Sequence, residues 1–342
     1  MFLQICFSLA DVCRFALFTF VVIGGTILLK WGETMLEVAQ LTIGKVAMLL
    51  CFIVAGFLLR ASGELPESAA KNLSVLSATI FCPAYNLRNL WNNFTVAKIS
   101  ENALVMSYGL LITLAAIGLA WLFASFFEKP GFARRSLAYA FSIPNYGYFG
   151  YPVIEGVFGS QVLTQVLVFV VPLSIATNTY GYLLFTPNGK ITWKRLLNPL
   201  ILAVVIGMAL GLSGIPMPGF IEDVLVGAGN CMSPVAMLLA GFVLGAFPLK
   251  KLLAGWRGYW VSAIRLLAIP ALFLGALLLC GAKGIWLLLP MVVVAMPLGL
   301  NLVVYPESMG MDASDNARMC CVSYLMAIVV LPVVFALLAR LA

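Results

Sequence analysis

Apolar runs of roughly 20 residues recur along almost the whole chain, and each is long enough to cross the hydrocarbon core of a bilayer as a helix. The composition agrees, because 63% of the 342 residues are hydrophobic and only 10% are charged. No polar stretch is long enough to fold as a separate soluble domain. The sequence therefore predicts an all-α polytopic membrane protein.

The apolar runs predict eleven spans, which are joined by short turns that contain Gly, Pro, Asn or charged residues. They lie at 14–30, 38–60, 68–90, 103–127, 135–158, 161–185, 197–214, 219–247, 257–281, 284–308 and 314–341. The first span is set apart because its apolar part is short and follows Asp11 and Arg14. It is either a signal-like or accessory helix or an extension upstream of a functional start at Met35. Ten spans then form the main body.

An internal repeat divides these ten spans into two halves. At a constant offset of 151 positions, Gly56, Ser62, Gly63 and Pro83 match Gly207, Ser213, Gly214 and Pro234. Each half holds five spans, and this odd number makes the second half enter the membrane from the opposite side. The predicted fold is therefore a ten-helix inverted repeat, five plus five. Its parts are an N-terminal extension (1–34), a first repeat (35–185), a cytoplasmic loop (186–196) and a second, inverted repeat (197–342).

The basic residues predict how this repeat is oriented. Lys and Arg are concentrated in the loops at 60–71, 128–135, 186–195 and 248–257, which all fall on one side of the predicted topology. Because cytoplasmic loops retain Lys and Arg, we expect this side to face the cytoplasm and both ends of the ten-span unit to face outside. The net charge of +7 comes from sparse acids more than from basic clusters, so no nucleic-acid partner is expected. The expected location is a plasma membrane, the bacterial inner membrane.

Two spans contain a proline in mid-span, Pro144 in "SIPNYGYFGYPV" and Pro297 in "MPLGLNLVVYP". Proline lacks an N–H group and its ring clashes with the carbonyl four residues earlier, so both helices are expected to break. In an inverted repeat the two breaks cross near the bilayer centre, where secondary transporters bind their substrates. Glycines there allow close approach, and asparagines supply neutral donors and acceptors. The residues expected at this crossing are Pro144, Asn145, Gly147, Pro297, Gly299 and Asn301.

The expected ligand of the crossing is an anion. Each break aims the N-terminus of a half-helix at the midplane with roughly half a positive charge, although the carbonyls of the preceding half-helices could hold a cation instead. Glu155 and Glu307 lie about ten residues beyond the breaks, roughly 15 Å along the helix axis, so no carboxylate is expected at the crossing. The chain has no histidine, and its eight cysteines lack the paired spacing of a metal site. No cofactor and no metal are therefore expected.

Five motifs stand in an order and spacing that characterise a known family. They are "IVAGFLLRASGELP", "IPNYGYFGYPV", "LLNPLILAVVIGMALGLSGIPMP", "GNCMSPVAMLLAGFVLG" and "AMPLGLNLVVYPESMGMD", and they cover approximately residues 36–342. Together they resemble the auxin efflux carrier family of membrane transporters, which includes plant PIN-FORMED carriers and bacterial carriers associated with malonate and other organic acids.

The resemblance implies a fold with two broken, crossing helices like that of sodium/proton antiporters and bile-acid symporters. It also implies a scaffold made from the first two spans of each repeat and a transport domain made from the last three, which move against each other like an elevator. Asn178 in "IATNTYGY" falls in the span where plant members carry a substrate-contacting asparagine. An amide that only packs helices is the alternative for Asn178.

The function expected from these features is secondary transport of a small organic anion, a malonate-like or auxin-like carboxylate bound at the crossing. Two alternatives stay open: a cation-coupled symporter or exchanger of the same fold, and a membrane sensor that binds solute without transporting it. An intramembrane enzyme is not expected, because without histidine no Ser-His dyad is available. The expected partners are the organic anion and the lipid bilayer, and a homodimer is left open.

Overall fold

The computed structural model describes residues 33–186 and 199–341. Within these two ranges the regular elements are all helices. The one β-bridge described there is isolated and antiparallel, between Pro144 and Leu298. The predicted all-α class is therefore confirmed for the described part of the chain. The predicted span at 14–30 and residues 187–196 of the predicted loop lie outside the described residues.

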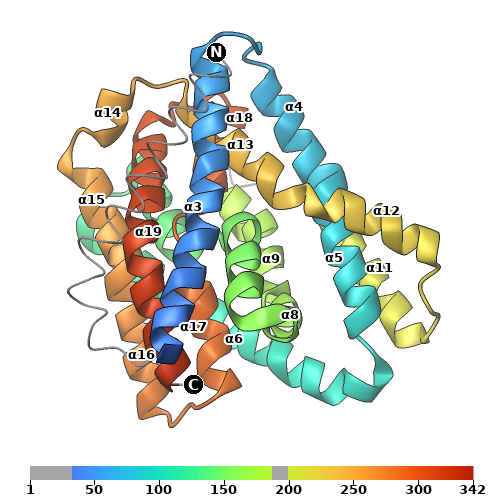
Figure 1. Cartoon of the computed structure of the whole chain (residues 1–342). Coiled ribbons are helices and arrows are strands. Elements are labelled where there is room, and N and C mark those ends of the chain that lie inside the picture. Colours follow the sequence, from blue (N-terminus) through green and yellow to red (C-terminus); the bar gives the residue numbers. More distant parts are fainter. Residues whose placement is uncertain (1–32, 187–198, 342) are drawn as a thin grey trace.

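The first half of the chain runs from blue to green in Figure 1. Its elements are α3 (Glu33–Ala61), α4 (Ala69–Leu76), the π turn η2 (Ser77–Phe81), α5 (Cys82–Asn93), the 3-10 turn η3 (Val96–Lys98), α6 (Ile99–Phe127), α7 (Phe132–Ser142), the π turn η4 (Tyr146–Gly150), α8 (Tyr151–Phe169), α9 (Val171–Ala176) and the π turn η5 (Thr177–Gly181). α8 is broken at Gly159, whose φ of 83° lies in the left-handed region that glycine adopts without strain. This break falls between the predicted spans at 135–158 and 161–185.

The second half runs from yellow to red in Figure 1. Its elements are α11 (Pro199–Ser213), α12 (Gly219–Asn230), α13 (Met232–Leu244), α14 (Leu249–Leu253), α15 (Trp256–Ala263), the π turn η7 (Ile264–Ala268), α16 (Ile269–Leu279), α17 (Ile285–Val294), α18 (Asn301–Ser308) and α19 (Ser314–Leu341). The residues at both ends of η7 keep helical dihedral angles, so α15, η7 and α16 form one continuous rod. The same holds for α4, η2 and α5.

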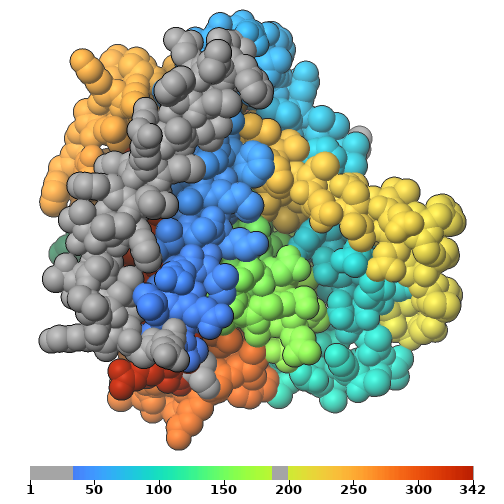
Figure 2. Space-filling model, in the orientation of Figure 1, coloured from blue at the N-terminus to red at the C-terminus, as the bar shows by residue number. Residues whose placement is uncertain are grey.

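Six segments of the described chain are long and apolar enough to cross a membrane. They are Thr34–Ala61, Val96–Phe127, Tyr146–Phe169, Gly219–Leu244, Trp256–Leu279 and Ser314–Leu341, and α11 and α17 are apolar but shorter. Large apolar side chains remain exposed on the outer helices, among them Leu122 (68%), Phe220 (73%) and Leu279 (91%). Figure 2 shows the yellow α11–α12 region projecting as part of one flank of the molecule. Surfaces of this kind suit contact with lipid rather than with water.

Glycines let two pairs of helices touch backbone to backbone. A Cβ atom added at Gly56 of α3 would lie 2.0 Å from the Leu238 carbonyl oxygen of α13. A Cβ atom added at Gly207 of α11 would lie 3.0 Å from the Leu87 carbonyl oxygen of α5. Gly56 and Gly207 are 151 positions apart, and so are Leu87 and Leu238. The offset that relates the two halves of the sequence therefore also relates these helix contacts.

The glycine contact between α3 and α13 predicts a measurable difference between two substitutions on one helix. Gly56→Ala is expected to destabilise the fold by about 1–3 kcal/mol, because the added methyl group meets a backbone carbonyl that cannot rotate away. Gly44→Ala, also on α3, adds a methyl group with nothing within 4 Å and should be neutral. The thermal unfolding midpoint in detergent measures both variants. Equal midpoints for the two would show that α3 and α13 do not depend on this close approach.

Charged side chains gather at one end of the helices. Arg257 pairs with Glu128 at 2.7 Å and with Asp315 at 3.1 Å, which joins the loop after α6 to the starts of α15 and α19. Arg60, at the C-terminal end of α3, stacks on the Phe242 ring near the C-terminal end of α13. The chain continues from this end of α13 into α14. Figure 1 shows the end of α3 and α14 at the top, with the C-terminus at the bottom. Three of the four predicted cytoplasmic loops thus lie at the same end of the molecule.

Candidate functional site

Two interrupted helices meet in the interior of the molecule. α7 ends at Ser142 and α17 ends at Val294, and a helical path resumes only at η4 and at α18. Between the interrupted ends, the Asn145 N–H group donates to the Pro297 carbonyl at 2.8 Å. Proline cannot continue the helical hydrogen bonds, and unpaired backbone groups are costly away from water, so the freed groups pair with the other interrupted helix. We call this region the crossing.

The last helix, α19, supports both sides of the crossing. The Ser323 hydroxyl accepts a hydrogen bond from the Leu298 N–H group at 3.1 Å. The Asn145 side-chain amide donates to the Tyr324 hydroxyl at 3.2 Å. Both Ser323 and Tyr324 are almost fully buried. The Tyr324 ring also stacks on Phe149 of η4, with ring centroids 5.9 Å apart, so α19 fixes the position of the backbone that follows the first break.

A buried arginine closes the carbonyl side of the crossing. Arg265, on η7, is 1% exposed. Its guanidinium group donates to the carbonyl oxygens of Phe141 at 3.0 Å, Val294 at 2.9 Å and Met296 at 3.1 Å. These carbonyls stand at the C-terminal ends of α7 and α17, the two half-helices that precede the breaks. Among the described residues, no acidic side chain forms an ion pair with Arg265.

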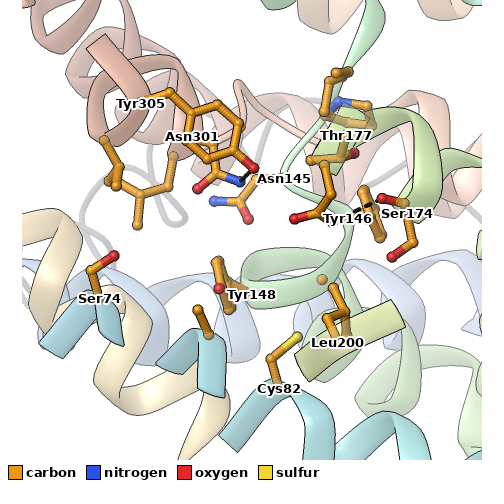
Figure 3. Close-up of a pocket in the computed structure, with 18 of the residues that line it drawn as sticks. Ser74, Cys82, Asn145, Tyr146, Tyr148, Ser174, Thr177, Leu200, Asn301 and Tyr305 are labelled. Carbon is orange, nitrogen blue, oxygen red and sulfur yellow. Dashed lines mark hydrogen bonds between the residues drawn. The ribbon is translucent and has the colours of Figure 1, made fainter. Parts of the chain in front are cut away.

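A cavity of about 190 Å³ opens on the other side of the crossing. Its lining comes from the crossing itself, from the rod of α4, η2 and α5, from α9 and η5, and from the start of α11. The described lining residues are Ser74, Ala78, Cys82, Asn86, Tyr139, Ile143, Pro144, Asn145, Tyr146, Gly147, Tyr148, Tyr151, Ser174, Thr177, Asn178, Pro199, Leu200, Gly299, Leu300, Asn301, Val304 and Tyr305. Figure 3 shows Asn145 and Asn301 on the crossing side, with Ser74 and Cys82 across the open space.

The described lining of the cavity is mostly apolar, and its polar side chains are amides, hydroxyls and one thiol, none of them ionic. Its positive character comes from the backbone, because η4 and α18 both begin at the cavity wall. The first turn of a helix has N–H groups without intrahelical partners and carries roughly half a positive charge. Two such ends converge here, which favours an anion. The volume is below the ~300–1,000 Å³ of sites for drug-sized ligands, which favours a small one.

The π turns concentrate at this place. The described residues form four of them, and η2, η4 and η5 contribute Ala78, Tyr146 and Thr177 to the cavity wall. The fourth, η7, carries Arg265. A π turn widens a helix locally and is frequent at functional sites. All four therefore mark the crossing and its cavity as the candidate functional site.

Comparison with known proteins identifies the family. The sequence model of the family described as "Membrane transport protein" matches residues 41–193 and 188–335. The chain belongs to this family. It is the auxin efflux carrier family that the sequence motifs resemble, so that prediction is confirmed. An uncharacterized transporter of Methanothermobacter thermautotrophicus is 23% identical over 291 residues, which cover 84% of this chain and 95% of the relative.

The structure brings together most of the residues that the sequence predicted for the site of this transporter. The predicted residues that line the cavity are Pro144, Asn145, Gly147, Asn178, Gly299 and Asn301. Pro297 is the exception, because it does not line the cavity and instead gives its carbonyl to the Asn145 N–H group. Asn178 bonds its own helix, donating to the Ser174 carbonyl at 2.9 Å. Asn301 similarly donates to the Tyr305 hydroxyl at 3.1 Å.

Asn145 has hydrogen-bonding capacity left for a ligand. An asparagine side chain offers two N–H donors and an acceptor oxygen. Asn145 uses one N–H donor, on the Tyr324 hydroxyl, whereas the Asn301 side chain bonds the hydroxyls of both Tyr305 and Tyr139. Across residues 33–186 and 199–341, no group of three His, Cys, Asp or Glu side chains could hold a metal ion. The described polar groups of the site are amides, hydroxyls and the first turns of η4 and α18.

Sequence reasoning missed the residues that hold the crossing from outside. Arg265 carried a clear signal, because a lone ionisable residue in the apolar run "WVSAIRLLAIPALF" is expensive in a membrane and therefore usually functional. Ser323 and Tyr324 carried a weaker one, since hydroxyl side chains are common in membrane helices. The aromatic hydroxyls of Tyr146 and Tyr148 also line the cavity and were part of a quoted motif, but were not predicted as site residues.

Proposed function

We propose that this transporter moves a small organic anion, a carboxylate, that binds in the cavity at the crossing. The observation that carries the proposal is the convergence of two helix N-terminal ends on a cavity whose described lining has no acidic side chain. A carboxylate there would receive hydrogen bonds from the amides of Asn145 and Asn301 and from backbone N–H groups. Charge-assisted hydrogen bonds of this kind are about twice as strong as neutral ones. Location in the bacterial inner membrane is part of this proposal.

We infer that the ten-span inverted repeat underlies this site. Its support is threefold. The contact of Gly56 with Leu238 and the contact of Gly207 with Leu87 correspond to each other, because 151 positions separate the two glycines and also the two leucines. The two interrupted helices occupy corresponding places in the two halves. The family model matches two ranges that overlap at 188–193, inside the predicted connecting loop.

An elevator-like movement is part of the proposal and rests on where the cavity lies. One wall comes from α4, α5 and α11, within the first two spans of each repeat, and carries Ser74, Cys82 and Leu200. The opposite wall is the crossing, which belongs to the last three spans of each repeat. The first group packs together through close glycine contacts, as a scaffold would. A ligand in the cavity therefore lies between the two groups, where sliding of one past the other would carry it across the membrane.

The proposal is tested by binding and by transport, in that order. A panel of organic anions, including malonate and phenylacetate, is screened for thermal stabilisation of the purified protein. A ligand at a hundred times its dissociation constant should stabilise the protein by about 2.7 kcal/mol. The ligands found are then offered to proteoliposomes that contain the protein. Binding without uptake would favour a sensor, and stabilisation by organic cations alone would contradict the anion site.

The basic end of the molecule predicts the topology in the cell. With native cysteines replaced, Lys71→Cys at the basic end should resist an impermeant thiol reagent in intact cells and react after the membrane is opened. Lys283→Cys, exposed on the predicted opposite side between α16 and α17, should react in intact cells. The reverse labelling pattern would show that the basic end faces outside, opposite to the predicted orientation.

A further inference from the structure

Arg265 is a buried charge that binding of an anion in the cavity does not itself require. It points away from the cavity, since it is absent from the described lining and contacts only the carbonyl side of the crossing. Removing an ion from water is costly unless the protein supplies an opposite charge. No acid among the described residues supplies one, whereas three backbone carbonyls accept hydrogen bonds from the Arg265 guanidinium group.

The compensation is close to complete by simple charge arithmetic. The C-terminal end of a helix carries roughly half a negative charge, and Arg265 contacts the ends of two helices, α7 and α17. Together they offset roughly one positive charge. The planar guanidinium group presents its donors in a fork, so one side chain can reach carbonyls of two separate chain segments at once. The single charge of a lysine could not do this equally well.

Neutralising the carbonyl ends has a consequence for the cavity. Without a cation on that side, the negative ends of α7 and α17 would oppose an anion placed at the positive ends of η4 and α18 nearby. A carrier built on crossed helices could meet this need with a soluble cation bound to the free carbonyls. Here the carbonyls of Phe141, Val294 and Met296 are already occupied by the guanidinium group.

We propose that Arg265 is a built-in counterion of the crossing, which takes the place of a soluble metal cation and lets the site bind its anion without one. This inference rests on the proposed anion site and deepens it. Arg265 is a positioning residue, because it acts on the ligand through the two half-helices and not by contact. The wild-type transporter should then bind its anion equally well whichever monovalent cation is present.

The test measures binding of malonate and of phenylacetate to the purified full-length protein by calorimetry, in Na⁺, K⁺ or choline buffers of equal ionic strength. Wild-type affinity should be the same in all three buffers. Arg265→Ala should bind at least about tenfold more weakly in choline, because the uncompensated negative ends of α7 and α17 would then oppose the bound anion. Added millimolar guanidinium should restore binding by entering the vacated space. Arg265→Met should show the same loss without rescue, because its side chain fills that space.

Several results would overturn the counterion role. They are a wild-type affinity that requires Na⁺, and an Arg265→Ala variant that binds as tightly as the wild type in choline. If neither probe binds the wild type, the proposed function fails instead. The counterion role is then tested by thermal unfolding. Guanidinium should raise the unfolding midpoint of Arg265→Ala and should not raise that of Arg265→Met. Equal responses would contradict it. If Arg265→Ala does not fold, Arg265→Lys decides, since a retained charge should keep binding independent of Na⁺.

Discussion

The variant Asn301→Asp is expected to bind an organic anion about a hundredfold more weakly than the wild type at neutral pH while keeping its fold. Asn301 begins α18 and lines the cavity, and aspartate has nearly the same shape and is favourable at a helix N-terminus. A ligand carboxylate would then face a like charge in the same cavity. Two such charges about 6 Å apart repel by about 2.8 kcal/mol at an effective dielectric constant of about 20, which is about a hundredfold in affinity.

Calorimetry with malonate and phenylacetate measures this loss at neutral pH, where the new carboxyl group is ionised. Asn72→Asp is the matched control, since Asn72 is exposed on α4 outside the cavity and undergoes the same change of charge. Tighter binding of organic cations to Asn301→Asp, with unchanged affinity for anions, would show that the cavity is a cation site.

The helical class and most of the span boundaries could be predicted because the bilayer leaves few alternatives. A spanning segment must satisfy its own backbone, so an apolar run of sufficient length reads directly as a helix. Glycine residues indicated where several helices end. Gly63 and Gly214 follow α3 and α11 with φ of 71° and 70°, and Gly159 breaks α8 with a φ of 83°. These positions need the left-handed region, which other residues rarely adopt.

The crossing could also be predicted in part, because proline acts locally. Pro144 and Pro297 lie where their helices are interrupted, whereas Pro332 lies inside the continuous α19, and the residues beside a break must face protein or a cavity. Asn145 and Asn301 followed from this rule. The rule could not say that Pro297 would give its carbonyl to the other interrupted helix instead of lining the cavity.

The support around the crossing depends on contacts between distant segments, which periodicity does not reveal. Arg265 lies 124 positions from Phe141, and the Tyr324 hydroxyl meets an amide 179 positions away. The π turn that carries Arg265 has no sequence signature of its own. Its signal lay in energetics, since a lone arginine inside an apolar run must find carbonyl partners or remain costly. A helix that ends away from water supplies such carbonyls.

Asn145→Ala is expected to lower transport of an organic anion ten- to a hundredfold while the protein still inserts and folds. The Asn145 side chain is 4% exposed and uses one N–H donor on Tyr324, which leaves the second donor available in the cavity. A hydrogen bond to a charged group contributes about 1.5–3 kcal/mol, which corresponds to the expected range. Uptake by proteoliposomes measures the loss, and the elution profile of the purified variant in detergent reports its fold.

Two further variants separate ligand binding from support of the fold. Asn89→Ala is the matched control, because Asn89 bonds the Tyr85 carbonyl within its own helix at 2.7 Å and does not line the cavity. It should transport as the wild type does. Tyr324→Phe removes the acceptor that orients the Asn145 amide but keeps the amide itself, so its loss should be smaller than that of Asn145→Ala. Normal uptake by a well-folded Asn145→Ala variant would mean that the amide at the break does not bind substrate. Asn301 and the backbone N–H groups at the starts of η4 and α18 would then have to bind the substrate without Asn145.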